Sequence, residues 1–234
     1  MMVDKKKTAR DAEGRIYYSF LNILLTVILL IGCNQVPLVS QLLEPPAKTV
    51  APTISFMDNF SDPKSGWDRI QSSVGTTDYH RETYQILVNA SSTDLFANPK
   101  QSFKDVIVEV TAARIGGPDH NNFGVICRYK DENNFYAAQI SSSGYGGIFR
   151  MKNGSYQLLG LDQMLPVPAV LGGNAPNRIR FECVGSTLLL VVNDAPVDYR
   201  EDNSFEIGDV GLIAGSYDQP GVQIAFDNFS VTQP

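Results

Sequence analysis

Only a few residues of this sequence have types and spacings that could carry out chemistry. Two carboxylates on one face of a strand, placed to act as acid and base, would be two residues apart, and no acidic pair after residue 33 has that spacing. Asp105 and Glu109 are four residues apart, about 13 Å along a strand, whereas hydrolysis of a glycosidic bond needs roughly 5 to 9.5 Å. His80 and His120 fall in a charged surface strand and in a turn-rich loop. We therefore expect no catalytic residue, although carboxylates from different strands could still form a pair.

Cys33 indicates a different kind of chemistry, the attachment of a lipid. It follows a basic segment and an apolar run over residues 23–31, and Leu30-Ile-Gly-Cys33 resembles the lipobox of bacterial lipoproteins. An uncleaved membrane helix over 16–32 is the alternative. The predicted organisation is a lipoprotein signal peptide over 1–32, a lipid-anchored Pro-rich tether over 33–53 and a folded domain over 54–234, held outside the cytoplasm at the cell membrane.

Composition excludes several classes of protein. The formal charge of -6 and a pI near 4.9 argue against electrostatic binding to nucleic acid. Hydrophobic residues make up 43% of the chain and charged residues 19%, which leaves room for a core and rules out a disordered chain. With three cysteines and two histidines, the usual four-ligand zinc site is not expected.

The segments after the tether have an apolar period of two, which predicts an all-β domain. Turn residues separate the segments at short spacing, as in a two-sheet antiparallel sandwich of jelly-roll type. Because the first and last strands both contain Asp-Asn-Phe among apolar residues, we expect them to lie side by side. The most strand-like segments are 106–112, 122–129, 135–140, 178–184, 187–192 and 222–231.

Cys127 and Cys183 each lie on the apolar face of a predicted strand. In an oxidising compartment such a pair predicts a disulfide within the core. Two buried free thiols are the alternative. The single tryptophan, Trp67, follows a turn and is expected to cap the core rather than to stack on a sugar.

Several motifs carry a family resemblance that covers nearly all of residues 55–232. They resemble bacterial domains of the concanavalin A-like lectin/glucanase superfamily, especially those described as 3-keto-disaccharide hydrolase-like. This resemblance implies two antiparallel sheets, one convex and one concave, and glycan binding. We expect no required cofactor. The resemblance implies a possible structural Ca²⁺ bound by Asp227 of the last strand. The motifs are Phe56-x-Asp-Asn-Phe-Ser-Asp-Pro-x-Ser-Gly-Trp67, Asn121-Asn-Phe-Gly-Val-Ile-Cys-Arg-Tyr129, Asn133-Asn-Phe-Tyr136, Asn177-Arg-Ile-Arg-Phe-Glu-Cys183 and Gly208-Asp-Val-Gly-Leu-Ile-Ala-Gly215.

Strand alternation also indicates which polar side chains could bind a ligand. Glu109, Arg128 and Arg180 are expected to point away from the core, where they could hydrogen-bond to sugar hydroxyls. Three tyrosines near hairpins, Tyr136, Tyr145 and Tyr156, could stack on a sugar face. The alternative is cross-strand ion pairing on a solvated sheet.

Together these patterns predict a membrane-anchored extracytoplasmic lipoprotein whose sandwich binds a carbohydrate or another surface ligand without catalysis. A sugar-active enzyme of keto-glycoside hydrolase or lyase type is one alternative. A protein–protein interaction module of the cell envelope is the other.

Overall fold

The structure is a computed structural model that describes residues 53–234. The predicted signal peptide, the lipidation of Cys33 and the tether lie outside these residues and remain predictions. In the described part of the chain, no helix has the length and hydrophobicity needed to cross a membrane.

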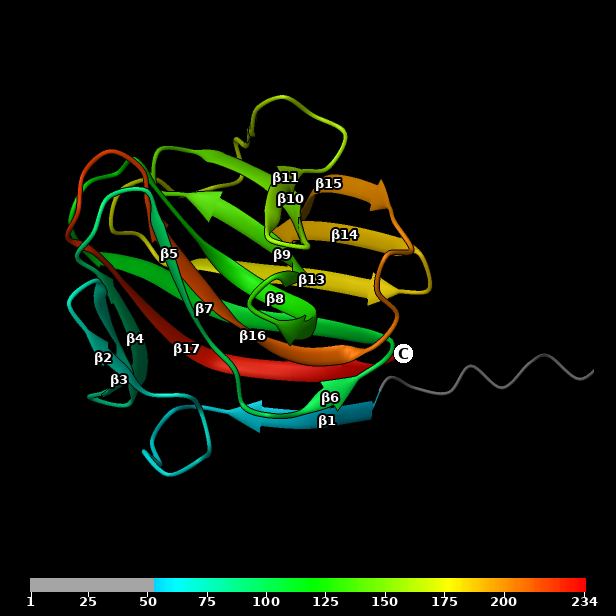
Figure 1. The fold of residues 1–234 in the computed structure, drawn as a ribbon, viewed down its shortest axis with the longest axis horizontal. Helices are drawn as coiled ribbons and strands as arrows, with labels where there is room; N and C mark the ends of the chain where they lie inside the picture. Colours follow the sequence, from blue (N-terminus) through cyan, green and yellow to red (C-terminus); the bar gives the residue numbers. More distant parts are fainter. Residues whose placement is uncertain (1–52) are drawn as a thin grey trace, which may run out of the picture. The chain divides into compact units, whose positions relative to one another are not determined.

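Residues 53–234 form two antiparallel sheets packed face to face, which confirms the predicted β-sandwich (Figure 1). Sheet A has nine strands and sheet B has eight. The neighbouring strands of sheet A are, in order, β15 (Ala195–Glu201), β14 (Thr187–Val192), β13 (Asn177–Val184), β7 (Val106–Gly116), β17 (Val222–Gln233), β4 (Thr83–Val88), β3 (Gly75–His80) and β2 (Ile70–Ser72), with β1 (Thr53–Asp58) also paired to β17. Those of sheet B are β11 (Ser155–Leu158), β10 (Tyr145–Lys152), β9 (Asn134–Ser141), β8 (Asn121–Asp131), β16 (Gly208–Ser216) and β5 (Thr93–Ala97), with β12 (Leu165–Pro166) paired to β10 and β6 (Ser102–Phe103) paired to β16.

The core lies between the two sheets because alternate residues of the strands are apolar. In β7, the side chains of Val106, Val108 and Val110 are buried, whereas the residues between them are partly exposed. β17 has the same pattern over most of its length. Each buried aliphatic side chain contributes about 1.5–3 kcal/mol of transfer free energy, so this alternation holds the sheets together.

The first and last described strands are neighbours, as their shared Asp-Asn-Phe motif predicts. β1 pairs antiparallel with β17, with Phe56 opposite Val231 and Asp58 opposite Phe229 (Figure 1). The two ends of the described chain therefore lie in the same sheet.

The predicted disulfide between Cys127 and Cys183 is present. Cys127 lies on β8 of sheet B and Cys183 on β13 of sheet A, with their Cα atoms 6.8 Å apart and both side chains fully buried. The bridge therefore joins the two sheets through the core.

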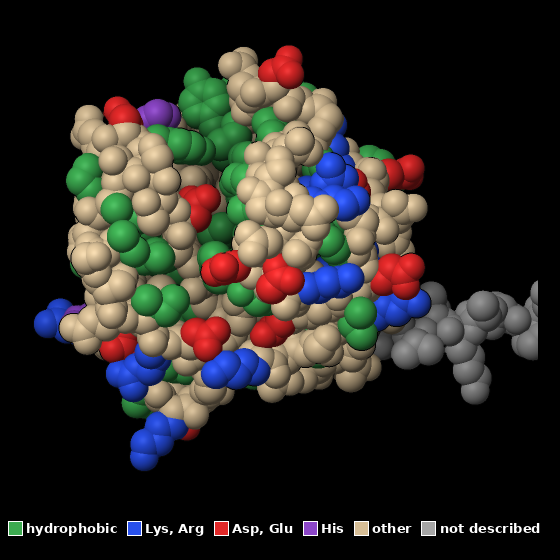
Figure 2. Space-filling model, viewed as in Figure 1, with side chains coloured by type: hydrophobic (Ala, Val, Ile, Leu, Met, Phe, Trp, Pro, Cys, Tyr) green, Lys and Arg blue, Asp and Glu red, His purple; other side chains and the backbone are tan. Residues whose placement is uncertain are grey.

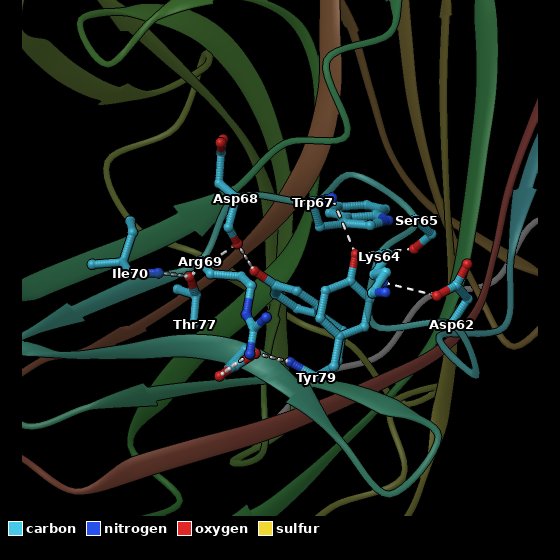
Figure 3. A network of polar contacts seen from close by, with 11 residues as sticks. Asp62, Lys64, Ser65, Trp67, Asp68, Arg69, Ile70, Thr77 and Tyr79 are labelled. Atoms are coloured by element: carbon cyan, nitrogen blue, oxygen red, sulfur yellow. Dashed lines mark hydrogen bonds and ion pairs between the residues drawn. The ribbon is translucent and has the colours of Figure 1, made fainter.

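Trp67 caps one end of the core, as the sequence indicates. Its side chain is 4% exposed, and its indole Nε1 donates a hydrogen bond to Asp58 Oδ2 at 2.9 Å. The acceptor is therefore a buried carboxylate. In Figure 3, the Tyr79 hydroxyl lies beside the Trp67 backbone, whose N–H donates to that oxygen at 3.1 Å. Ser65 also donates to Asp58, so the turn before Trp67 is held by one carboxylate.

Candidate functional site

Two of the predicted ligand-binding residues, Glu109 and Arg180, lie opposite each other on the outer face of sheet A. Arg178 Nε is 3.9 Å from Glu109 Oε1, and Arg180 Nη2 is 3.1 Å from Glu182 Oε1. The outer face of sheet A is therefore an ion-paired, solvated surface, which is the alternative to ligand binding by these residues. The larger cavities lie elsewhere, on sheet B.

Arg128 and Tyr136 do not point into solvent, so the expectation that their side chains could contact a ligand is wrong. The ladder between β8 and β9 shifts register after Cys127, and Arg128 has a φ of 52°, so strand alternation is broken at this residue. The Arg128 side chain is 1% exposed and donates to the backbone carbonyls of Lys104, Phe205 and Cys183. Tyr136 is fully buried, and its hydroxyl donates to Asp202. Both residues stabilise the fold.

The outer face of sheet B carries polar side chains in a row across its strands. Asp94 of β5 is opposite Gly215 of β16, and Gly215 is opposite Asn122 of β8. A Cβ atom at position 215 would lie 1.7 Å from Asp94 Oδ1 and 2.7 Å from Asn122 Oδ1. The missing side chain of Gly215 therefore leaves the space in which these two polar groups lie.

Hydrogen bonds continue this row toward the other side of the sheet. Gln139 of β9 is fully buried, and its Nε2 donates to Asn122 Oδ1 at 2.9 Å. The Tyr156 hydroxyl of β11 donates to Gln139 Oε1 at 2.7 Å. Because both amides are held by their neighbours, their orientations are set before any ligand arrives.

These groups line a cavity of about 420 Å³ that also has aromatic walls. The rings of Phe149 and Tyr156 stack with centroids 5.0 Å apart and planes 9° apart. Figure 2 shows the hollow on this face, with hydrophobic side chains around it and acidic side chains nearby. The cavity is lined by Ser92, Thr93, Asp94, Asn122, Gln139, Phe149, Tyr156, Ser216, Tyr217 and Asp218.

Tyr217 separates this cavity from a second one of about 390 Å³. Tyr145, another predicted ligand-binding residue, lines the second cavity and is 43% exposed. The ring of His120 stacks on Tyr217 with a centroid distance of 4.5 Å, and His120 Nδ1 lies 3.0 Å from Asp218 Oδ1. The loop histidine thus braces the wall shared by the two cavities.

The environment of Asp94 differs from that of Asp218. Burial raises the pKa of the Asp94 carboxyl, and a hydrogen bond with Asn122 offsets part of that shift. The hydrogen bond with His120 lowers the pKa of Asp218. The cavity therefore contains one carboxylate that lacks a nearby cation and one that is paired at the rim.

We expect Asp94→Asn to stabilise the folded domain at neutral pH. The raised pKa means that the folded state binds the Asp94 proton more tightly than the unfolded state, so ionised Asp94 costs stability above its folded-state pKa. The stability difference between Asp94→Asn and the native protein should be largest at pH 7 and should shrink as the pH falls through that pKa. Denaturant unfolding of both proteins between pH 4 and pH 7 measures this difference. A less stable variant at pH 7 would contradict the burial argument.

Asp227, the predicted calcium ligand, lies where β17 shifts register against β7. Its Oδ1 accepts a hydrogen bond from the backbone N–H of Asn228 at 2.7 Å. Within residues 53–234, no group of three or more His, Cys, Asp or Glu side chains is placed to hold a metal ion. Calcium binding at Asp227 therefore stays a prediction.

No protein-family model matches this chain, and no curated protein matches it. Its fold is similar to that of the carbohydrate binding module CBM66 from Bacillus subtilis, with 21% identity and a TM-score of 0.58 over 71% of this chain and 94% of that one. It is also similar to a Bacillus subtilis protein of unknown function with a galectin-like fold, with 12% identity and a TM-score of 0.55 over 78% of this chain and 98% of that one. A xylan β-1,4-xylosidase from Bacillus halodurans C-125 is 13% identical, with a TM-score of 0.55 over 76% of this chain and 39% of that one. These likenesses show that the chain has the concanavalin A-like β-sandwich fold.

The sequence did not single out Asp94, Asn122 or Gln139. Two weak signals were available: Asn122 is part of the resemblance motif that begins at Asn121, and Gln139 interrupts the apolar run of β9. Neither signal shows that the residues meet, because β5 is far from β8 in sequence and the register of the β8–β9 hairpin shifts after Cys127.

Proposed function

We propose that this protein binds a glycan in the hollow of sheet B, without catalysis, as a lipid-anchored protein outside the cytoplasm. The observation that carries the proposal is the row of Asp94, Asn122, Gln139 and Tyr156, the last three joined by hydrogen bonds, inside an aromatic-walled cavity. Sugars present hydroxyls at their edges and C–H groups on their faces, so fixed polar groups and aromatic rings suit them. The similarity to a carbohydrate binding module supports this at the level of the fold.

The carboxylates of the cavity favour binding over hydrolysis. Glycoside hydrolysis uses two carboxyl groups on opposite sides of the scissile bond, usually one with a raised pKa and one ionised. Asp94 could be the first, but the Asp218 side chain is 65% exposed at the rim and is held by His120. A nucleophile at such a solvated position would compete with water, so we expect saturable binding without turnover.

A glycan-array screen of the full chain in a non-glycosidic detergent, with calcium present, tests the proposal. Each hit is followed by product analysis. Saturable binding with unchanged glycan is the expected result, whereas turnover would favour an enzyme. An array without any bound glycan would overturn the proposal and shift the interpretation to a protein partner.

Tyr217→Ala should weaken binding of an array hit by tenfold or more. The ring forms the wall between both cavities, and aromatic groups at such central positions contribute about 2 kcal/mol or more to binding. Titration calorimetry measures the change. Arg180→Ala, on the opposite sheet, is the matched control and should leave the affinity unchanged. Equal affinities of the Tyr217→Ala and native proteins would place the ligand elsewhere.

The proposed location rests on Cys33 and gains support from the disulfide. Buried disulfides persist mainly in oxidising compartments, and Cys127–Cys183 is such a bridge. We expect Cys33→Ala to abolish incorporation of labelled fatty acid in bacterial cells, whereas Ser40→Ala should retain it. Label on the Cys33→Ala protein would contradict lipidation at this residue, and a native protein without label would favour an uncleaved membrane helix.

A further inference from the structure

The larger cavity of sheet B is anionic. Among the described residues that line it there are two aspartates, Asp94 and Asp218, and no Lys, Arg or His. The structure pairs this lining with one basic group among the described residues, His120, which contacts Asp218 and lines the second cavity. A ligand in the cavity therefore meets two carboxylates, of which Asp94 has no basic partner among the described residues.

The acidic character extends along the same face. The side chains of Phe96, Tyr129 and Phe135 form an aromatic cluster next to Tyr156, with neighbouring centroids 5.5 to 6.3 Å apart. Burial raises the pKa of Tyr129 to about 12, and four carboxylates add to the shift. They are Glu132, Asp131, Asp68 and Asp209. Figure 2 shows acidic side chains gathered around the hollow.

Asp94 has the surroundings that a bound cation would favour. Its carboxylate is desolvated and is held by the uncharged Asn122, so most of its hydrogen-bonding capacity is available to a ligand. The rings of Tyr156, Phe149 and Tyr217 line the same cavity. An ammonium group there would donate a charge-assisted hydrogen bond to the carboxylate and would be attracted to the ring faces.

We propose that the cavity over Asp94 takes the protonated amine of an amino sugar, so that the ligand is a glycan with free amino groups. This inference rests on the proposed glycan binding and specifies its ligand class. A neutral sugar could offer Asp94 only an uncharged donor, a hydroxyl or an amide N–H. An acidic sugar would bring a further negative charge beside Asp94 and Asp218, and such like-charge contacts are unfavourable.

Two oligosaccharides that differ only at the amino groups test the inference. The probes are the β-1,4-linked tetramer of glucosamine and its fully N-acetylated counterpart, titrated into the full chain in a non-glycosidic detergent at 0.15 M salt and pH 6.5. We expect the amine form to bind at least tenfold more tightly. Asp94→Asn should remove this preference, while Glu109→Gln on sheet A should keep it.

The two variants are matched because each removes one negative charge. An equal loss in Asp94→Asn and Glu109→Gln would show general attraction of a polycation to an acidic protein and would overturn the inference. Equal or tighter binding of the acetylated tetramer would also overturn it, but would leave glycan binding intact. If neither tetramer binds, the amine preference is overturned. The glycan array then decides the proposed function separately. Thermal unfolding of each variant confirms that it is folded.

Discussion

Replacement of both Cys127 and Cys183 by alanine should lower the free energy of unfolding by about 4 kcal/mol. The bridge joins residues 56 positions apart, so the unfolded chain with the disulfide has far fewer conformations than the chain without it. It also links β8 to β13 across the core, and therefore holds the sheet that carries the candidate site against the other sheet.

Denaturant unfolding of the native and double-variant proteins measures this loss. The native protein unfolded in the presence of a strong thiol reductant is the control, because it should lose a similar amount without any substitution. An unchanged midpoint for both would show that the bridge contributes little. Mass spectrometry of unreduced peptides should find Cys127 linked to Cys183.

Trp67→Ala should lower the free energy of unfolding by about 3–5 kcal/mol. The indole packs against Phe60, Tyr84 and Phe229, with ring centroids 4.9 to 5.5 Å away. Its removal leaves a cavity and takes a hydrogen-bond donor away from the Asp58 carboxylate, which is 9% exposed. The turn that Asp58 organises would loosen as well.

Chemical denaturation of a small set of variants separates these contributions. Trp67→Phe keeps much of the ring volume but loses the N–H group, so we expect a loss of about 1–3 kcal/mol from the missing hydrogen bond to the Asp58 carboxylate. Tyr199→Ala, at a side chain that is 54% exposed, should stay within about 0.5 kcal/mol of the native protein. Trp67 lines neither cavity on sheet B, so folded Trp67→Phe should bind glycan normally. A large loss of binding with little loss of stability would make Trp67 a sugar platform instead.

Much of the architecture could be predicted from local pattern. The apolar alternation predicts the strands over 106–112, 178–184 and 187–192, and the observed β7, β13 and β14 contain these segments. The same alternation places Cys127 and Cys183 inside the core, where they form the bridge. Local pattern is sufficient here because each side chain's face depends only on its own strand.

The prediction for Arg128 failed because alternation assumes a regular strand. A register shift and a φ of 52° turn its side chain inward at the end of the sandwich. Glu109 and Arg180 do point outward, as predicted, but from sheet A, whereas Tyr145 lies beside a cavity on sheet B. A period of two indicates that a side chain faces outward, without indicating which sheet it belongs to.

By itself, the sequence determined that alternate apolar residues of the regular strands enter the core, that two cysteines could meet there, and that the first and last strands match. Only the tertiary structure decided that Asp94, Asn122 and Gln139 form one site. These residues come from β5, β8 and β9, and they meet through strand pairing and over the gap that Gly215 leaves. The physical reason is that the direction of a side chain is local to its strand, whereas neighbours across a sheet depend on strand order and register.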